Sequence, residues 1–190
     1  MRKLKLQMQM SVDGFVGGPN GELEWMTWNW SDDIKKYVTD LTNSFDTIVM
    51  GRKMADGFVT HWTNVLNDSS SDGENKEAAK KFVETPKVVF SRTLSKSNWE
   101  NTTVEKDLVA GISNLKNASG SGIIAYGGAN FVSSLIQNGL VDELHLFLNP
   151  VAIGKGLSIF SADKTHNLKL VKAIPFECGI VLHHYEPAKS

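Results

Sequence analysis

The segment Ile123-Ile124-Ala125-Tyr126-Gly127-Gly128-Ala129-Asn130-Phe131 indicates how this chain folds. The four residues that end at Tyr126 are predicted to form a short buried strand, and the two glycines a tight turn. An amphipathic helix follows from Asn130, because Phe131, Leu135 and Ile136 recur at helical spacing. Asn138-Gly139 supplies its C-terminal stop. A strand, a glycine turn and a helix in this order are typical of an α/β domain.

The glycine pair between strand and helix can also serve a ligand. Glycine lets the backbone approach a bound molecule closely, and the free amides at the start of a helix attract an anion. A phosphate or pyrophosphate suits such a place. A plain strand–turn–helix connection without a ligand explains this segment by itself equally well.

The rest of the chain continues the alternation of strands and helices up to about residue 140, after which strands dominate. Strands are predicted at 3–12, 47–51, 87–90, 102–105, 123–126, 143–148, 168–173 and 180–185. Helices are predicted at 31–44, from 52 to near 62, and at 76–85, 107–117 and 130–138, with a loop at 66–75. This order predicts a three-layer α/β fold in one domain, residues 1–190, with a mainly parallel sheet. The last two strands, joined near 177–179, predict an antiparallel C-terminal edge.

Composition excludes several classes of protein. With 190 residues, 41% apolar and 22% charged, the chain has an ordinary globular balance. Its 20 basic and 21 acidic side chains leave a net charge of -1, so no nucleic-acid partner is expected. No apolar run approaches the roughly 20 residues of a membrane helix, so no membrane partner is expected either. The single cysteine, Cys178, cannot form an internal disulfide, and a cytoplasmic location is predicted.

Three predicted strands end in residues suited to a phosphorylated ligand. They are followed by Gly51-Arg52-Lys53, by Ser91-Arg92-Thr93 and by the glycine turn. Ligands of open α/β sheets collect beyond the carboxyl ends of the strands, where arginine binds phosphate bidentately. A solvated surface charge is the alternative for any single one of these basic residues. Neither G-x-G-x-x-G after a strand nor G-x-x-x-x-G-K-[ST] is present, which disfavours a conventional Rossmann dehydrogenase and a P-loop NTPase.

Taken as a set, five segments resemble the dihydrofolate reductase-like superfamily. They are Ser11–Phe15, Met50–Lys53, Ser91–Leu94, Tyr126–Gly128 and Gly139–Leu144, in matching order over nearly the whole chain. The resemblance is closest to the C-terminal reductase domain of riboflavin biosynthesis and its stand-alone bacterial relatives. It implies a three-layer αβα dihydrofolate reductase-like fold and an NADPH-dependent oxidoreductase. Relatives of this branch are commonly dimers, so a homodimer is expected.

The resemblance also implies a substrate class. The expected reaction is hydride transfer to a small heteroaromatic molecule, in the manner of a 5-amino-6-(5-phosphoribosylamino)uracil reductase. A pterin, dihydrofolate or another small carbonyl or imine compound is the alternative substrate. A non-catalytic NADPH-binding sensor is an alternative of another class. A substrate with a ribose phosphate calls for an additional basic group, and the sequence identifies none.

By position, the resemblance implies a cofactor site. Gly127, Gly128 and Ala129 are expected at the pyrophosphate. Arg52, Lys53, Ser91 and Arg92 are expected around the 2′-phosphate, which favours NADPH over NADH. Val16 and Gly17 are expected to border the nicotinamide. The full set of expected cofactor-binding residues is Val16, Gly17, Gly51, Arg52, Lys53, Ser91, Arg92, Thr93, Tyr126, Gly127, Gly128, Ala129 and Asn130.

Several residues are candidates for catalysis or substrate binding, and each of them can instead have a purely structural role. Asp32 or Asp33 falls near the carboxylate of dihydrofolate reductases, although first-turn acids also cap helices. Asp13 matches the Ser-x-Asp-Gly segment of the riboflavin-pathway enzymes, although it can equally be a turn residue before Gly14. Trp28 and Trp30 can stack on a flat ring or pack in the core.

No metal site is predicted from the five histidines. Neighbouring residues of a strand point to opposite faces, so His183 and His184 do not share an ion. His61, His145 and His166 have no partner at ligand spacing. The pair Asp142-Glu143, which opens a strand, is predicted to face water.

Overall fold

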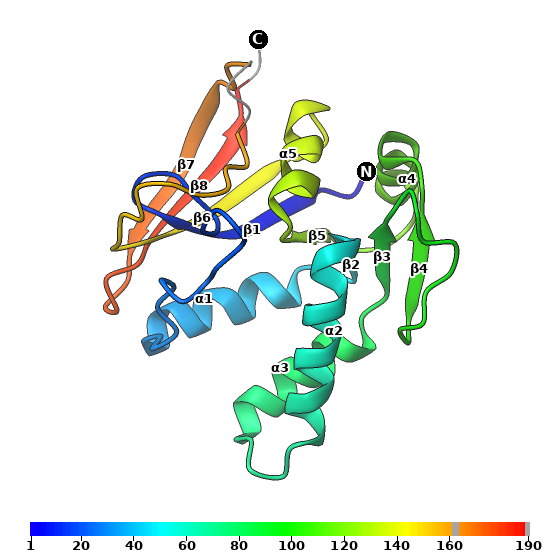
Figure 1. Ribbon diagram of the computed structural model, residues 1–190, viewed down its shortest axis with the longest axis horizontal. Helices are drawn as coiled ribbons and strands as arrows, with labels where there is room; N and C mark the ends of the chain where they lie inside the picture. Colours follow the sequence, from blue (N-terminus) through cyan, green and yellow to red (C-terminus); the bar gives the residue numbers. More distant parts are fainter. Residues whose placement is uncertain (161–163, 189–190) are drawn as a thin grey trace.

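The computed structural model describes residues 1–160 and 164–188 as eight strands and five helices (Figure 1). The strands are β1 (Leu4–Ser11), β2 (Thr47–Gly51), β3 (Lys87–Phe90), β4 (Thr102–Glu105), β5 (Ile123–Tyr126), β6 (Glu143–Asn149), β7 (Leu168–Pro175) and β8 (Val181–Pro187). The helices are α1 (Asp32–Asn43), α2 (Arg52–Asn67), α3 (Gly73–Glu84), α4 (Leu108–Asn117) and α5 (Ala129–Gln137). Among the described residues, no helix is both long and apolar enough to cross a membrane.

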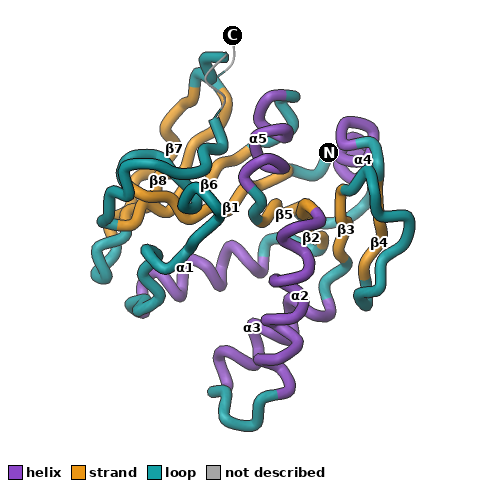
Figure 2. Tube along the Cα trace, in the orientation of Figure 1, coloured by secondary structure: helices purple, strands orange, loops and turns teal. Residues whose placement is uncertain are grey.

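All eight strands join one sheet in the order β4-β3-β2-β5-β1-β6-β8-β7 (Figure 2). The pairs from β4 to β6 are parallel, and the pairs β6–β8 and β8–β7 are antiparallel. The mainly parallel sheet with an antiparallel C-terminal edge is therefore confirmed. β2 and β5 lie in its middle and are covered on both faces, which explains their continuous apolar sequences.

Helices cover both faces of the sheet, as the three-layer prediction required (Figure 1). α4 and α5 pack on one face, where Ile112 and Leu135 join the inward residues of β1 in one core cluster. α1, α2 and α3 cover the other face, where Phe45, Phe58 and Phe82 pack on Met50 of β2 and on Tyr126 of β5. The alternation of buried and half-buried residues along β1 follows from this: its apolar side chains point toward α5 and its polar ones toward α1.

The hairpin of α2 and α3 is longer than predicted. α2 continues beyond Trp62 to Asn67, and α3 begins at Gly73, so the loop between them is 68–72 rather than 66–75. Trp62 packs on Phe82 of α3 with ring centroids 4.5 Å apart, which stabilises the last turns of α2. Asp72 caps α3 by accepting a hydrogen bond from the amide of Asn75.

The prediction that Asp142 and Glu143 face water is wrong. Glu143 is only 9% exposed, because β6 lies between β1 and β8 and the acid faces α1. Its Oε1 accepts from Lys3 at 2.7 Å. Asp142 is half-buried, accepts from the amide of Leu4 at 2.7 Å and pairs with Lys116 at 2.6 Å. Both acids thus join the first strand to its neighbours.

Candidate active site

The carboxyl ends of β3, β2 and β5 lie side by side in the sheet. Gly51 pairs with Phe90 of β3, and Met50 pairs with Tyr126 of β5, so the three strands end at nearly the same level. A Cβ placed on Gly51 would lie 2.9 Å from the Cβ of Phe131 in α5. Phe131 in turn stacks on Phe90 at 5.6 Å. The segments that follow these strands therefore border one edge of the sheet.

The turn between β5 and α5 requires its glycines. Gly127 and Gly128 have φ values of +36° and +82°, which side chains rarely allow. A Cβ on Gly127 would also lie 2.9 Å from Sδ of Met54 in α2. Gly128 precedes α5 without a side-chain cap, so the first amides of this helix are open to an anion.

Two hollows lie beside the end of β3. The larger has a volume of about 490 Å³ and is lined by Arg92, Lys106, Asp107, Leu108, Val109, Ser134 and Asn138. The smaller has a volume of about 180 Å³ and is lined by Arg52, Asp56, Leu94, Asn98 and Trp99. The two arginines thus line different hollows, and the turn after β3 contributes Arg92 to the larger and Leu94 to the smaller.

Some of the expected cofactor residues are engaged elsewhere through their side chains. Oγ of Ser91 accepts from the amides of Thr93 and Leu94, which shapes the turn after β3. The ring of Tyr126 packs among Phe45, Phe58 and Phe82, and its hydroxyl donates to Gln7 at 3.2 Å. The side chains of Ser91 and Tyr126 therefore stabilise the backbone around the site. The exposed members of the expected set are Arg52, Lys53, Arg92, Thr93 and Asn130.

The segment after β1 is held by hydrogen bonds to the segment after β6. Val16 and Gly17 are buried and form backbone hydrogen bonds with Leu157 at 2.8 Å. The carboxylate of Asp13 accepts from the amides of Ile153 and Gly154, the latter at 2.7 Å. A hydrogen bond from Ser11 is the main cause that lowers the pKa of Asp13. Asp13 is therefore an ionised anchor between the segments that follow β1 and β6.

Asp33 and Asp32 differ in their surroundings although they are neighbours. Asp33 accepts from the hydroxyl of Ser31, from the amide of Ile34 and, at 3.1 Å, from the amide of Glu177 in the β7–β8 turn. The bond from Ser31 is the main cause that lowers its pKa. Asp32 points into solvent and pairs with Lys35 at 3.5 Å. The two acids are thus not equivalent: one joins α1 to the hairpin and the other lies on the surface.

The tryptophans lie on an extended segment above the ends of β1 and β6. Trp28 is 65% exposed, and its ring lies 5.9 Å from that of Trp30. The segment is held by Asn149, whose Oδ1 accepts from the amide of Thr27 at 3.1 Å. Asn149 is fully buried, and its Nδ2 donates to Gln9 at 2.7 Å. Asn149 was not among the residues expected at the site, although a polar residue that ends a buried strand before a proline was a signal.

Comparison with known proteins identifies the family. The sequence model of the RibD C-terminal domain family matches residues 2–182 of this chain. The chain belongs to the RibD C-terminal domain family. This family is one of oxidoreductases of riboflavin biosynthesis, and the expected resemblance is confirmed.

Three proteins are similar to this RibD-type domain in sequence or in fold. Protein YyaP of Bacillus subtilis (strain 168) is 33% identical over 181 residues, 95% of this chain and 92% of that protein. A riboflavin biosynthesis protein of Shewanella sp. PV-4 shares the fold with a TM-score of 0.72 at 17% identity, over 100% of both chains. Dihydrofolate reductase of Enterococcus faecalis, solved with NADP(H), has a TM-score of 0.64 at 14% identity, over 98% of this chain and 97% of that one. The RibD C-terminal domain therefore has the dihydrofolate reductase-like fold in this chain.

Proposed function

We propose that this protein is an NADPH-dependent reductase that transfers a hydride to a small heteroaromatic compound of the pyrimidine type. The observation that carries the proposal is the common edge of β3, β2 and β5, which combines two exposed arginines with the open start of α5. The dihydrofolate reductase that shares the fold was solved with NADP(H). The family's link to riboflavin biosynthesis supports a pyrimidine as substrate.

The residues present fit this cofactor. The glycine turn brings backbone amides to the edge of the sheet without a side chain in the way, which suits a pyrophosphate. Arg52, at the start of α2, and Arg92, in the turn after β3, line the two hollows beside the end of β3 and suit the adenosine end with its additional phosphate. The bound cofactor supplies the hydride, and the protein supplies position and charge.

The substrate would lie between this edge and the segment that carries the tryptophans. Gln7 of β1 pairs with Tyr126, the last residue of β5, and β1 continues for four more residues. The segment after β1 therefore stands above the end of β5. Trp28 is exposed and offers an aromatic face for a flat ring, whereas Trp30 beside it packs against the core cluster that contains Phe147. Because Asp13 and Asp33 accept several hydrogen bonds and their pKa values are lowered, we infer that they position this segment and do not donate the proton.

A second candidate substrate is a heterocycle without a phosphate, such as a pterin. The rim made by residues 12–33, 150–157 and 176–179 bears acids at Asp13, Glu22, Glu24, Asp32, Asp33 and Glu177. Its only lysine is Lys155, which lies near Glu22. A phosphorylated substrate would meet a negative field there, whereas the basic groups lie at the cofactor end.

Cofactor binding tests the first part of the proposal. Quenching of tryptophan fluorescence measures the dissociation constants of NADPH and NADH. Arg52→Ala and Arg92→Ala should each weaken NADPH binding about tenfold or more, since each removes a charged contact to phosphate. Binding of NADH should change much less. Lys36→Ala is the control, because Lys36 is exposed on α1 and pairs with Asp40. Equal affinity for the two cofactors, unchanged by both variants, would contradict the proposal.

Turnover tests the second part and separates enzyme from sensor. Oxidation of NADPH is followed at 340 nm with ribosylaminouracil substrates that differ only in the 5′-phosphate, and with dihydropterins. Turnover of any of them supports a reductase, and a preference for the unphosphorylated compounds supports the second candidate. NADPH binding without oxidation by any of these compounds would favour a cofactor-binding sensor.

A further inference from the structure

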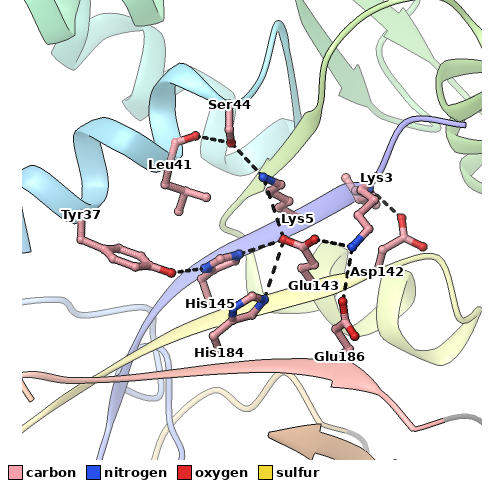
Figure 3. A network of polar contacts seen from close by, with 11 residues as sticks. Lys3, Lys5, Tyr37, Leu41, Ser44, Asp142, Glu143, His145, His184 and Glu186 are labelled. Carbon is pink, nitrogen blue, oxygen red and sulfur yellow. Dashed lines mark hydrogen bonds and ion pairs between the residues drawn. The ribbon is translucent and has the colours of Figure 1, made fainter. Parts of the chain in front are cut away.

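A buried polar cluster lies on the α1 face of the sheet (Figure 3). It is near the start of β6, whereas the candidate active site lies at the carboxyl ends of the strands. Glu143 and His145 are two residues apart on β6 and share a face. His184 of β8 is the direct partner of His145 in the antiparallel ladder. The two imidazole rings stack with centroids 4.2 Å apart and an angle of 17°. The expectation that His145 has no partner at ligand spacing is therefore wrong, because register joins it to a strand 39 residues further on.

Three ligand atoms converge in this cluster. Oε2 of Glu143 lies 3.3 Å from Nε2 of His145 and 3.8 Å from Nε2 of His184. All three atoms lie within 4.8 Å of one another. Metal–ligand bonds of roughly 2.1 Å in a tetrahedral site place ligand atoms about 3.4 Å apart. Small side-chain movements would therefore bring the three atoms around one ion.

The neighbours of these side chains orient them toward that point. The hydroxyl of Tyr37 lies 2.9 Å from Nδ1 of His145, which leaves Nε2 facing Glu143. Lys3 binds the other carboxylate oxygen, Oε1, at 2.7 Å, and Lys5 is hydrogen-bonded to Ser44. Oε2 faces the two imidazoles, and Nζ of Lys5 lies 3.9 Å from it. A second contact such as that of Tyr37 with His145 fixes the ligands of metal sites.

The cluster contains a polar atom that the protein does not satisfy. Nε2 of His184 is buried and has no hydrogen-bond partner among the described residues. The side chains of Glu143, His145 and His184 are only 11%, 5% and 15% exposed, so solvent gives little compensation. A buried nitrogen without a partner calls for an explanation, and an ion is one.

We propose that Glu143, His145 and His184 bind one divalent transition-metal ion of the zinc class. One carboxylate and two imidazoles are a donor set that such ions prefer, and three protein ligands leave one coordination position open. The ion would join β6 to β8 and, through Tyr37, to α1. Lys3 and Lys5 lie close to Glu143, at 2.7 and 3.9 Å, and their charges lower the affinity. The proposal is independent of the reductase function.

Metal titration of the chelator-treated full chain tests the proposal. We expect calorimetry to show one Zn²⁺ per chain, and Co²⁺ to give the visible bands of a four-coordinate ion. His184→Ala should weaken Zn²⁺ binding at least about 100-fold, since it removes one of three ligands. His183→Ala is the matched control, because His183 is the adjacent residue and points to the other face. Absence of a bound ion, or equal binding by the wild type and His184→Ala, would overturn the proposal.

A second variant, Lys3→Met, should raise the Zn²⁺ affinity, which a loss of folding cannot do. The side chain of Lys3 is 55% exposed, so Lys3→Met should fold normally. It removes the nearer of the two cations beside Glu143, and Zn²⁺ affinity should rise several-fold. An unchanged or lower affinity in Lys3→Met would overturn the assignment of Glu143 as a ligand, whether or not His184→Ala folds.

Discussion

Asn149 at the end of β6 accepts a 3.1 Å hydrogen bond from the amide of Thr27, 122 positions away in the sequence. This bond holds the segment that carries Trp28 and Trp30 above the carboxyl ends of β1 and β6. Because Asn149 is fully buried and also donates to Gln9, it links this segment to two central strands. The position of the aromatic rings therefore depends on a core residue.

Replacing Asn149 by alanine should loosen this segment and destabilise the protein. The amide of Thr27 and the side chain of Gln9 would lose their partner, and leaving such buried groups unpaired costs about 1–3 kcal/mol. Urea unfolding measures the loss of stability, and tryptophan anisotropy the mobility of the segment. Asn29→Ala, at an exposed position of the same segment, should change neither. Equal anisotropy in both variants would show that Asn149 does not hold the segment.

Asp33 and Asp32 should respond differently to substitution. Asp33→Asn keeps one acceptor for the amide of Ile34 or Glu177, and its turnover should fall less than about tenfold. Loss of a general acid would lower turnover about 100-fold or more. Asp32→Asn should leave both turnover and melting temperature unchanged, because the side chain points into solvent. A 100-fold loss of turnover in Asp33→Asn but not in Asp32→Asn, together with a flattened pH profile of turnover, would show instead that Asp33 is the proton donor.

Gly128→Ala should destabilise the turn between β5 and α5. The φ of Gly128 is +82°, and a non-glycine residue held in such a conformation costs about 1–3 kcal/mol. A clash does not contribute, because the nearest atom to an added Cβ, that of Phe131, is 3.7 Å away. Gly57→Ala in the interior of α2 is the matched control and should stabilise by up to about 1 kcal/mol. Equal melting temperatures for the two variants would contradict this account.

Lys87 should make stability depend on pH above 8. It is 2% exposed and donates to the carbonyls of Phe82, Val83 and Thr85 at the end of α3. Burial lowers its pKa from 10.5 to about 8. The folded protein gives up this proton above about pH 8, while the unfolded chain keeps it until about 10.5. The free energy of unfolding should therefore rise between these values, by about 3 kcal/mol at most.

The comparison with Lys87→Met isolates this contribution, since the other groups that titrate in this range are common to both proteins. Urea unfolding from pH 7 to 10.5 should show the difference between wild type and Lys87→Met growing with pH. Lys80→Met, at an exposed lysine of α3, should run parallel to the wild type. Parallel curves for Lys87→Met would mean that Lys87 keeps its proton throughout.

Local sequence determined the elements of this fold and the edge where a cofactor is expected. β2, β3 and β5 were predictable because apolar runs between turn residues leave a short chain few alternatives to a buried strand. The glycines at 127 and 128 were predictable because a turn with positive φ tolerates little else. The end of α2 was mispredicted, because its last turns are stabilised by Trp62 on Phe82 in another helix.

Only the tertiary structure decided what the polar side chains meet. Asp13 reaches amides about 140 positions away, and His145 faces His184 across a strand pair. Such contacts depend on the register of the sheet, and a slip of one residue would turn every side chain to the other face. Register results from packing of the whole core, so sequence patterns predicted that Glu143 opens a strand but not that it is buried beside two histidines.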